Sequence, residues 1–208
     1  MKADLQERVL DAVCRTLDEH AAQFDALDEA IGDGDHGTNL KRVGAAIAAK
    51  KKQLVGGQPG EMLKALAALV RSEGSGAGGT YYAALLQGMA ETAPEGAVDL
   101  PALVRMLDAG VEAVQDAGGA RKGDKTMLDV LVPVADALRT AVAHGRTDEL
   151  GGRLIAAAGH GLHHTSRIEA KKGLAADLGP ASVNHLDPGA CSSALLIGAV
   201  VAVFEPRA

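Results

Sequence analysis

Apolar residues recur every three or four positions along most of the chain, which places them on one face of an α-helix. This spacing predicts eight helices, with apolar positions that cover residues 5–24, 40–54, 62–70, 82–89, 100–114, 127–142, 150–162 and 190–204. Pro133 lies inside the sixth of these helices and predicts a bend there. No segment shows the strict alternation expected of a half-buried strand. The pattern therefore predicts an all-α protein.

The connections between the predicted helices are short and rich in glycine and proline, which favours antiparallel neighbours in a bundle. No linker and no internal repeat interrupts the pattern, so we expect a single domain over residues 1–208. Glycine clusters directly before four of the helices, at residues 32–37, 74–79, 118–123 and 188–189. Helix starts expose free backbone N–H groups with partial positive charge, and glycine lets an anion approach that backbone closely. Several such starts at one end of a bundle would bind a polyphosphate.

Composition narrows the possible functions. Of the 208 residues 47% are apolar, which is ample for a core, but there are only two Phe, two Tyr and no Trp, so the helices must pack on small side chains. The formal charge of −6 argues against a protein that binds nucleic acid through a basic face. We expect a cytoplasmic protein without a membrane segment, because no apolar run approaches roughly 20 residues and the N-terminus does not resemble a signal peptide. Cys14 and Cys191 lie among apolar neighbours and are expected to be buried free thiols.

Three carboxylates fall within eight residues on a turn broken by glycine: Asp28, Asp33 and Asp35. Carboxylates this close repel one another unless a cation lies between them, and Mg²⁺ is commonly held by a few carboxylates together with phosphate oxygens and waters. The alternative is a polar turn whose aspartates cap helices. An EF-hand is excluded, because a loop counted from Asp33 has Gly37 at its fifth position and Gly44 at its twelfth. The sequence thus predicts a magnesium site that handles phosphate.

The first residues of the next helix carry further polar groups. His36 and Asn39 could contact a phosphate or a metal-bound water, or they could be simple caps. Asp187-Pro188-Gly189 predicts an N-cap followed by proline at the first helical position.

Two glycine-rich segments are near matches to nucleotide motifs. Residues 74–79 fit G-x-G-x-x-G, but the helical segment before them excludes a Rossmann fold, and neither V-A-I-K nor H-R-D is present as in protein kinases. Either this segment cradles phosphate at a helix start, or it is a flexible turn. Residues 118–126 miss the Walker A pattern because Asp124 precedes Lys125, which leaves a glycine-rich helix start with a Lys-Thr pair.

Three histidines share one predicted helix face: His160, His163 and His164. No carboxylate accompanies them as in H-E-x-x-H, so an exposed helix face is favoured over a zinc site.

Four motifs in order over almost the whole chain resemble the L subunit of bacterial dihydroxyacetone kinase: D-x-x-I-G-D-G-D-H-G-x-N, the glycine-rich loop, G-D-K-T-M-L-D-V-L-x-P and H-L-D-P-G-A. The resemblance implies an eight-helix antiparallel barrel that binds ADP or ATP at one end through two Mg²⁺ ions. By this match the metal ligands are Asp28, Asp33 and Asp35. The nucleotide-binding residues that it implies are His36, Gly37, Thr38, Asn39, Ser75, Gly76, Ala77, Gly78, Gly118, Thr126, Met127, Asp187, Pro188 and Gly189.

The resemblance also implies partners. Such an L subunit transfers a phosphoryl group to dihydroxyacetone, which a separate K subunit holds covalently on a histidine, and no nucleophile from the L chain is required. Either ATP is exchanged in each turnover, or ADP is retained and rephosphorylated by a phosphohistidine-carrying M subunit of the sugar phosphotransferase system. A second copy of the chain is a further candidate partner.

Two departures from the family pattern affect the expected function. The loop G-G-A-S-G is here Gly74-Ser75-Gly76-Ala77-Gly78, and K-G-R-A-S-Y-L-G is here residues 172–179 with Leu174 in place of the arginine. Losing a charge-assisted donor near a transferring phosphate weakens transition-state stabilisation unless Lys171 or Lys172 replaces it. Two alternatives stay open: a kinase subunit for a four- or five-carbon ketose, and a nucleotide-sensing regulator that binds another protein and catalyses nothing.

Overall fold

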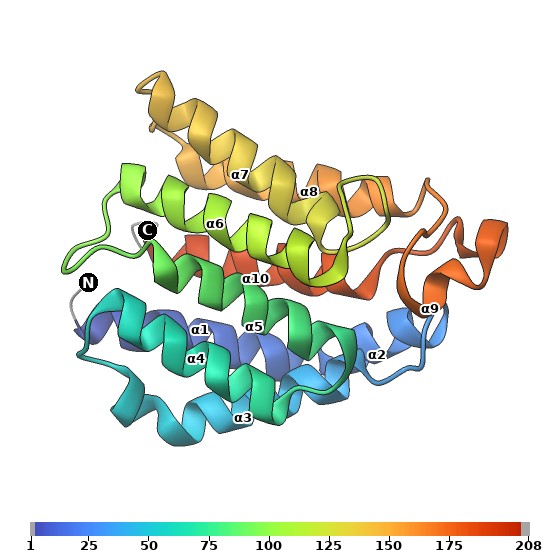
Figure 1. The fold of residues 1–208 in the computed structure, drawn as a ribbon, viewed down its shortest axis with the longest axis horizontal. Helices are drawn as coiled ribbons and strands as arrows, with labels where there is room; N and C mark the ends of the chain where they lie inside the picture. The colour runs from blue at the N-terminus through green and yellow to red at the C-terminus, as the bar shows by residue number, and fades with distance from the viewer. Residues whose placement is uncertain (1–2, 205–208) are drawn as a thin grey trace.

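The computed structural model describes residues 3–204, and these residues form helices without any β-strand (Figure 1). The all-α prediction is confirmed. The helices are α1 (Ala3–Glu19), α2 (Ala21–Glu29), α3 (His36–Leu54), α4 (Pro59–Glu73), α5 (Gly76–Glu91), α6 (Leu100–Gly118), α7 (Leu128–Ala143), α8 (Leu150–Thr165), α9 (Gly173–Ala176), the 3-10 turn η1 (Gly179–Ser182) and α10 (Pro188–Phe204).

The first predicted helix is in fact two helices, because the chain turns at His20. The apolar spacing runs through this position without a break, so the pattern alone could not show the turn. The reason lies in tertiary packing: α2 packs chiefly on α3, and a Cβ atom at Gly37 would overlap the carbonyl oxygen of Ala21. The other seven predicted helices correspond to α3–α8 and α10, and α7 continues through Pro133. The short helix α9 was not predicted.

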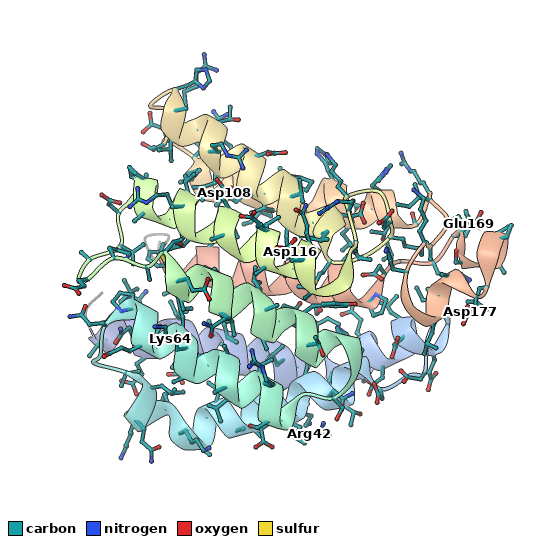
Figure 2. The ribbon with its side chains drawn as sticks, in the orientation of Figure 1. Arg42, Lys64, Asp108, Asp116, Glu169 and Asp177 are labelled. Atoms are coloured by element: carbon teal, nitrogen blue, oxygen red, sulfur yellow. The ribbon has the colours of Figure 1, made fainter. Side chains whose placement is uncertain are left out.

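Consecutive helices from α3 to α8 pack side by side and run in alternating directions, and α10 packs against both α1 and α8 (Figure 1). The main core is built from Leu, Val and Ala side chains with the buried rings of Phe24 and Tyr82. Charged side chains such as Lys64 and Asp108 point away from the bundle (Figure 2). The predicted packing on small apolar residues is therefore what the structure has.

Alternating directions bring several helix ends together at one end of the bundle. The end of α2, the starts of α3, α5 and α10, the α6–α7 loop and α9 all meet there (Figure 1). His160, His163 and His164 are exposed on α8. Both cysteines are free, with Cys191 buried and Cys14 partly buried. Among the helices of residues 3–204, none combines the length and the apolar character needed to span a bilayer.

Candidate functional site

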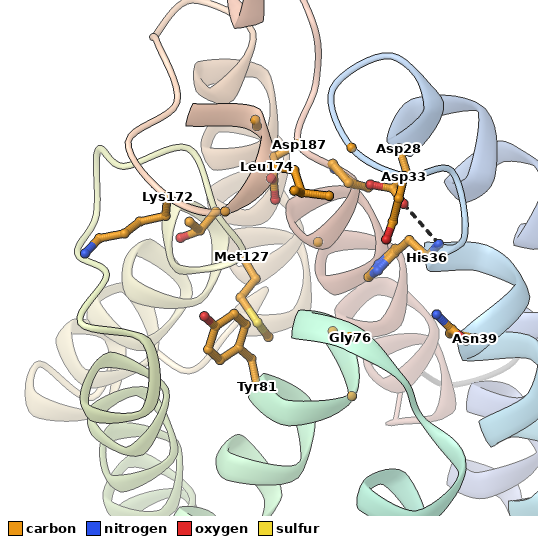
Figure 3. A pocket seen from close by; sticks show the side chains of 18 of the residues that line it. Asp28, Asp33, His36, Asn39, Gly76, Tyr81, Met127, Lys172, Leu174 and Asp187 are labelled. Atoms are coloured by element: carbon orange, nitrogen blue, oxygen red, sulfur yellow. Dashed lines mark hydrogen bonds between the residues drawn. The ribbon is translucent and has the colours of Figure 1, made fainter. Parts of the chain in front are cut away.

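A pocket of about 500 Å³ opens where these helix ends meet (Figure 3). It is lined by segments far apart in the sequence: the turn before α3, the α4–α5 connection, the α6–α7 loop, residues 172–175 and the start of α10. Of the residues predicted from the sequence, those that line the pocket are Asp28, Asp33, Asp35, His36, Asn39, Ser75, Gly76, Gly78, Thr126, Met127, Asp187, Pro188 and Gly189.

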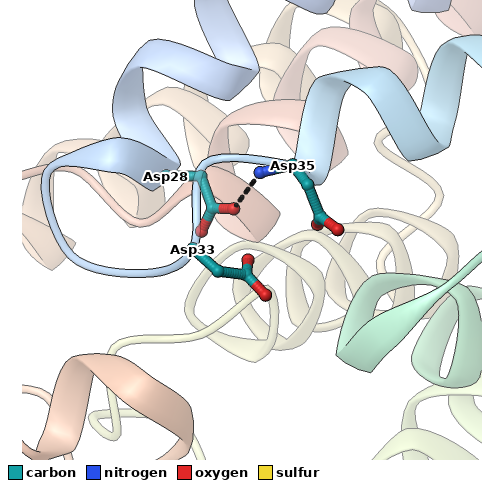
Figure 4. Close-up of side chains that lie close together, drawn as sticks. All are labelled: Asp28, Asp33 and Asp35. Atoms are coloured by element: carbon teal, nitrogen blue, oxygen red, sulfur yellow. Dashed lines mark hydrogen bonds between the residues drawn. The ribbon is translucent and has the colours of Figure 1, made fainter.

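The three predicted carboxylates converge at one side of this pocket. Asp28, Asp33 and Asp35 each place a carboxylate oxygen within 4.8 Å of the others (Figure 4). Asp33 and Asp35 are exposed, whereas Asp28 is partly buried. In the described part of the chain this is the one cluster of three or more potential metal ligands. Oxygen ligands at such spacing suit a hard divalent cation.

Asp28 is both a member of this cluster and a helix cap. Its Oδ2 accepts hydrogen bonds from the backbone N–H groups of Asp35 (3.0 Å) and His36 (3.2 Å). A Cβ at Gly32 would overlap the Asp28 carboxylate, so glycine is required beside it. The capping interpretation thus applies to Asp28, while Asp33 and Asp35 leave their carboxylates free of hydrogen bonds to the described residues.

Asp25, which the sequence analysis missed, fixes the same helix start from one turn earlier on α2. Its carboxylate accepts hydrogen bonds from the backbone N–H (2.9 Å) and the hydroxyl (2.8 Å) of Thr38. Two carboxylates from α2 therefore cap α3, a favourable arrangement at the positive end of a helix dipole. No motif marks Asp25, because its role depends on how α2 packs against α3.

His36 connects the carboxylates to the glycine-rich loop. Its Nε2 lies 2.9 Å from the Ser192 hydroxyl, which also contacts the Tyr82 hydroxyl at 2.8 Å and donates to the Gly189 carbonyl. The Ser192 hydroxyl therefore joins His36, Tyr82 and the start of α10 in one hydrogen-bond network. Burial lowers the pKa of His36, although the surrounding aspartates oppose this. The Nδ1 side of the His36 ring faces Gly78.

The glycines of the α4–α5 connection are required by close approach. A Cβ at Gly79 would come within 2.7 Å of the Gly74 carbonyl carbon, and one at Gly78 would lie 3.0 Å from the His36 ring. Gly76 has φ +66°, a left-handed conformation that favours glycine. The connection therefore brings the backbone at the start of α5 against His36, beside the pocket.

The α6–α7 loop is built around the buried side chain of Asp129. This carboxylate accepts hydrogen bonds from the backbone N–H groups of Gly123 (2.7 Å) and Thr126 (2.9 Å). These hydrogen bonds hold the loop in a shape in which Thr126 and Met127 line the pocket.

Lys125 borders the pocket, but its ammonium group is directed into the protein. Only 1% of it is exposed, and its ammonium donates to the backbone carbonyls of Thr165, Ile168 and His185. Burial lowers the pKa of Lys125. Lys125 has a left-handed φ of +62°, and its ammonium group binds backbone carbonyls inside the protein.

The start of α10 follows the predicted pattern. Asp187 caps it by accepting from the backbone N–H of Ala190 (2.7 Å), and Pro188 is its first residue. Burial raises the pKa of Asp187 to about 7. The cap at this helix start is therefore sensitive to pH near neutrality.

Three residues implied by the resemblance lie outside the pocket lining. Gly37 packs against Ala21, and Thr38 is bound to Asp25. Gly118 packs against the Tyr81 ring, where a Cβ would come within 2.8 Å of Oη. The side chain of Ala77 is outside the described part of the structure.

Some residues that line the pocket were not predicted from the sequence, and others were predicted only in part. Tyr81 lines the pocket beside Met127, and no motif marked it. Leu174, which replaces the family arginine, borders the pocket with 56% of its surface exposed, whereas Lys172 extends away from the carboxylates (Figure 3). Lys171 pairs instead with Asp124 at 3.5 Å. Within residues 3–204, neither lysine takes the place of the arginine beside the carboxylates.

Comparison with known proteins agrees with this architecture. The DAK2 domain model matches residues 30–202. The ADP-binding subunit of a PEP-dependent dihydroxyacetone kinase from Listeria innocua is 35% identical over 84% of this chain and 83% of its own length. The ADP-binding subunit of a PTS-dependent dihydroxyacetone kinase from Lactococcus lactis is 35% identical over 90% of each chain.

Longer proteins also match. The triokinase/FMN cyclase of Bos taurus is 32% identical over 96% of this chain, which spans only 35% of that protein. The crystal structure of the C. freundii dihydroxyacetone kinase in complex with AMP-PNP and Mg²⁺ superposes with a TM-score of 0.74, at 24% identity, over 96% of this chain and 34% of that one. This likeness supports the fold.

Proposed function

Because this chain belongs to the DAK2 domain family, we propose that it is the nucleotide-binding subunit of a dihydroxyacetone-type kinase. It binds ADP or ATP with Mg²⁺ in the cytoplasm and passes a phosphoryl group to dihydroxyacetone, or a related short ketose, on a separate K-type subunit. The observation that carries the proposal is the meeting of three carboxylates with the starts of α3, α5 and α10 around one pocket. Carboxylates suit a cation, and the uncapped N–H groups at the start of α5 suit a phosphate, which are the two groups that phosphoryl transfer needs.

The metal part of the proposal rests on Asp28, Asp33 and Asp35. Their oxygens lie close enough to share ions, and two of the three carboxylates have no competing hydrogen bonds to the described residues. Two Mg²⁺ ions held here would neutralise phosphate charge during in-line transfer. The hydrogen bonds to Asp28 fix the turn, so that the three side chains stay together without a ligand.

The phosphates lie between the carboxylates and the glycine-rich loop. The start of α5 leaves N–H groups free for phosphate, because no side chain caps it, whereas the N–H groups of His36 and Thr38 at the start of α3 are bound by Asp28 and Asp25. The side chains of His36 and Asn39 lie on one side of this space, and the segment of residues 75–78 lies on the other. Gly37 and Thr38 do not line the pocket; they hold the start of α3 against α2 through Ala21 and Asp25. We expect these residues to position the phosphates and to form no covalent intermediate with them.

The nucleoside lies farther along the pocket, away from the carboxylates. Tyr81 and Met127 provide an apolar wall, and Gly118 supports the Tyr81 ring. Thr126 and the turn of Asp187, Pro188 and Gly189 complete the enclosure.

One observation favours a second candidate acceptor. Leu174 places an exposed apolar side chain at the pocket border where the family has an arginine. This change favours an acceptor other than dihydroxyacetone, such as a four- or five-carbon ketose, still held by a K-type subunit.

The test combines the purified chain with a K-type subunit, Mg-ATP and a panel of three- to five-carbon ketoses. Formation of a sugar phosphate supports the kinase, and the preferred ketose identifies the acceptor. A parallel reaction replaces ATP with ADP and a phosphohistidine-carrying M subunit, which separates exchange from retention of the nucleotide. Nucleotide binding without transfer to any ketose would support the sensing regulator, and no nucleotide binding would overturn the proposal. Light scattering of the same sample determines whether a homodimer forms.

A further inference from the structure

We propose that Arg42 is a positioning residue of the phosphate site: it aims the Asn39 amide into the pocket and keeps the start of α5 open for an anion. The inference rests on the proposed nucleotide-binding function. Arg42 is not among the pocket-lining residues, so it acts through its neighbours.

Arg42 joins three segments through one side chain. It lies on α3, one turn after Asn39, where the helix passes the α4–α5 connection (Figure 2). Its Nε donates to the Glu73 carbonyl (2.6 Å), and its Nη2 donates to both Asn39 Oδ1 (2.8 Å) and Ser75 Oγ (2.8 Å). The end of α4, the start of α5 and the first turn of α3 are therefore tied together at one guanidinium group.

The bond to Asn39 determines which way its amide faces. A guanidinium group offers only donors, so the Asn39 atom beside it must be the carbonyl oxygen. The Nδ2 then points in the other direction, toward the pocket that Asn39 lines. Only 7% of Asn39 is exposed, and its Nδ2 makes no hydrogen bond to another residue of the described chain. No fully buried side-chain nitrogen or oxygen of the described residues lacks a hydrogen-bond partner, so Nδ2 is open to the pocket, where a phosphate oxygen would accept from it.

The bond to Ser75 has a second effect. A serine at the N-cap normally accepts a hydrogen bond from the second or third N–H group of its helix. Ser75 is the N-cap of α5 but makes no such bond, and its hydroxyl oxygen accepts from Arg42 instead. The N–H groups at the start of α5 are therefore not occupied by their own cap and remain available to a ligand.

Lysine could not replace Arg42 in this role. The three acceptors lie around a planar group that presents several fixed donors, whereas an ammonium group is a point charge on a flexible chain. Arg42→Lys should keep the positive charge near the loop but lose the simultaneous hold on Asn39, Glu73 and Ser75.

The test measures Mg-ADP affinity by titration calorimetry for wild type, Arg42→Ala, Arg42→Lys, Asn39→Ala and the double variant Arg42→Ala/Asn39→Ala. We expect Arg42→Ala to weaken binding about 10- to 100-fold and Arg42→Lys to weaken it less. The double variant should lose less than the product of the two single losses, because both act on the same amide. Arg139→Ala is the matched control: Arg139 is another exposed arginine, bound to Asp108 and Asp136, and it lies away from the pocket. The control should bind like wild type.

A spectroscopic readout separates positioning from simple loss of stability. The side-chain NH₂ resonances of Asn39, assigned by their absence in Asn39→Ala, should shift on addition of Mg-ADP in wild type and not in Arg42→Ala. If Arg42→Ala does not fold, the same comparison is made with Arg42→Lys and Arg42→Gln.

The outcomes distinguish the two proposals. Wild type that does not bind Mg-ADP would overturn the proposed function and this inference with it. Wild type that binds, together with unchanged affinity in the folded Arg42 variants, would overturn the role of Arg42 alone. Losses that multiply in the double variant, or an Asn39 amide that shifts equally without Arg42, would do the same.

Discussion

Two regions that border the same pocket are held in very different ways. The carboxylate corner (Asp28, Asp33 and Asp35) is fixed from within, because Asp28 accepts two backbone hydrogen bonds across the turn. The α9 rim (residues 171–178) is attached by backbone hydrogen bonds at its first residue and around α9, and it exposes Leu174 and Leu178. The corner is thus arranged before any ligand arrives, whereas side chains of the rim can change without disturbing the helical core. We infer that binding depends on the corner and that the choice of acceptor depends on the rim.

Removing one charge from the corner should have the largest effect. We expect Asp33→Asn to weaken Mg-ADP binding by roughly 100-fold or more, because an amide is a poor replacement for a carboxylate ligand. Helical circular dichroism should stay unchanged, since Asp33 is exposed and its carboxylate caps no helix. The matched control is Asp177→Asn, an exposed acid on the rim. Equal losses in both variants would remove the distinction between the two regions.

Removing the metal tests the corner without a mutation. With ADP and MgCl₂ present at about 100 times the dissociation constant, EDTA should lower the melting temperature by about 5–10 °C, because a ligand that binds only the folded state stabilises it. EDTA added without nucleotide should have a smaller effect. A melting curve unaffected by EDTA in the presence of ADP would contradict the metal assignment.

The sequence was most informative about the corner. Its carboxylates, its glycines and the helix start after it all lie in one short segment, so their proximity follows from the chain itself. The helices could be predicted from apolar spacing for the same local reason.

What the sequence did not show arises from contacts between distant segments. The turn at His20, the cap by Asp25 and the placement of Tyr81 depend on how α2, α3, α5 and α6 pack. The α9 rim could be located only through the family resemblance, which pointed to Leu174. Lys125 stands within a motif, yet its ammonium group binds backbone carbonyls of segments distant in the sequence.

Restoring a cation on the rim should have an intermediate effect. We expect Leu174→Arg to tighten Mg-ATP binding about tenfold, since a charge-assisted hydrogen bond to phosphate becomes possible at the pocket border. Calorimetry measures the affinity, and the ketose panel measures any change of acceptor. Leu178→Arg is the control, because Leu178 is also exposed on this segment but does not line the pocket. If arginine at position 174 and arginine at position 178 tightened Mg-ATP binding equally, the gain would come from net charge and not from a contact at the pocket border.

The smallest expected effect concerns Asp187, at the start of α10 on the pocket floor. Because burial raises its pKa from 3.8 to about 7, the folded state favours the protonated form. The associated stability is fully present below about pH 4 and is lost as the pH rises through about 7. The melting temperature of wild type minus that of Asp187→Asn, measured without Mg²⁺, should therefore decrease between pH 4 and pH 8. A constant difference would contradict the shifted pKa of Asp187.

Lys125 connects two of the segments that border the pocket. Its ammonium binds carbonyls on both sides of the α9 region, at Thr165 and Ile168 before it and at His185 after it, while its own backbone belongs to the α6–α7 loop. The Lys125 side chain therefore connects the α6–α7 loop, which carries Met127, to both ends of the segment that carries Leu174. If a partner subunit displaced the ends of the segment that carries Leu174, the α6–α7 loop and Met127 would move with them. Docking of the partner would then change how Met127 contacts a nucleoside.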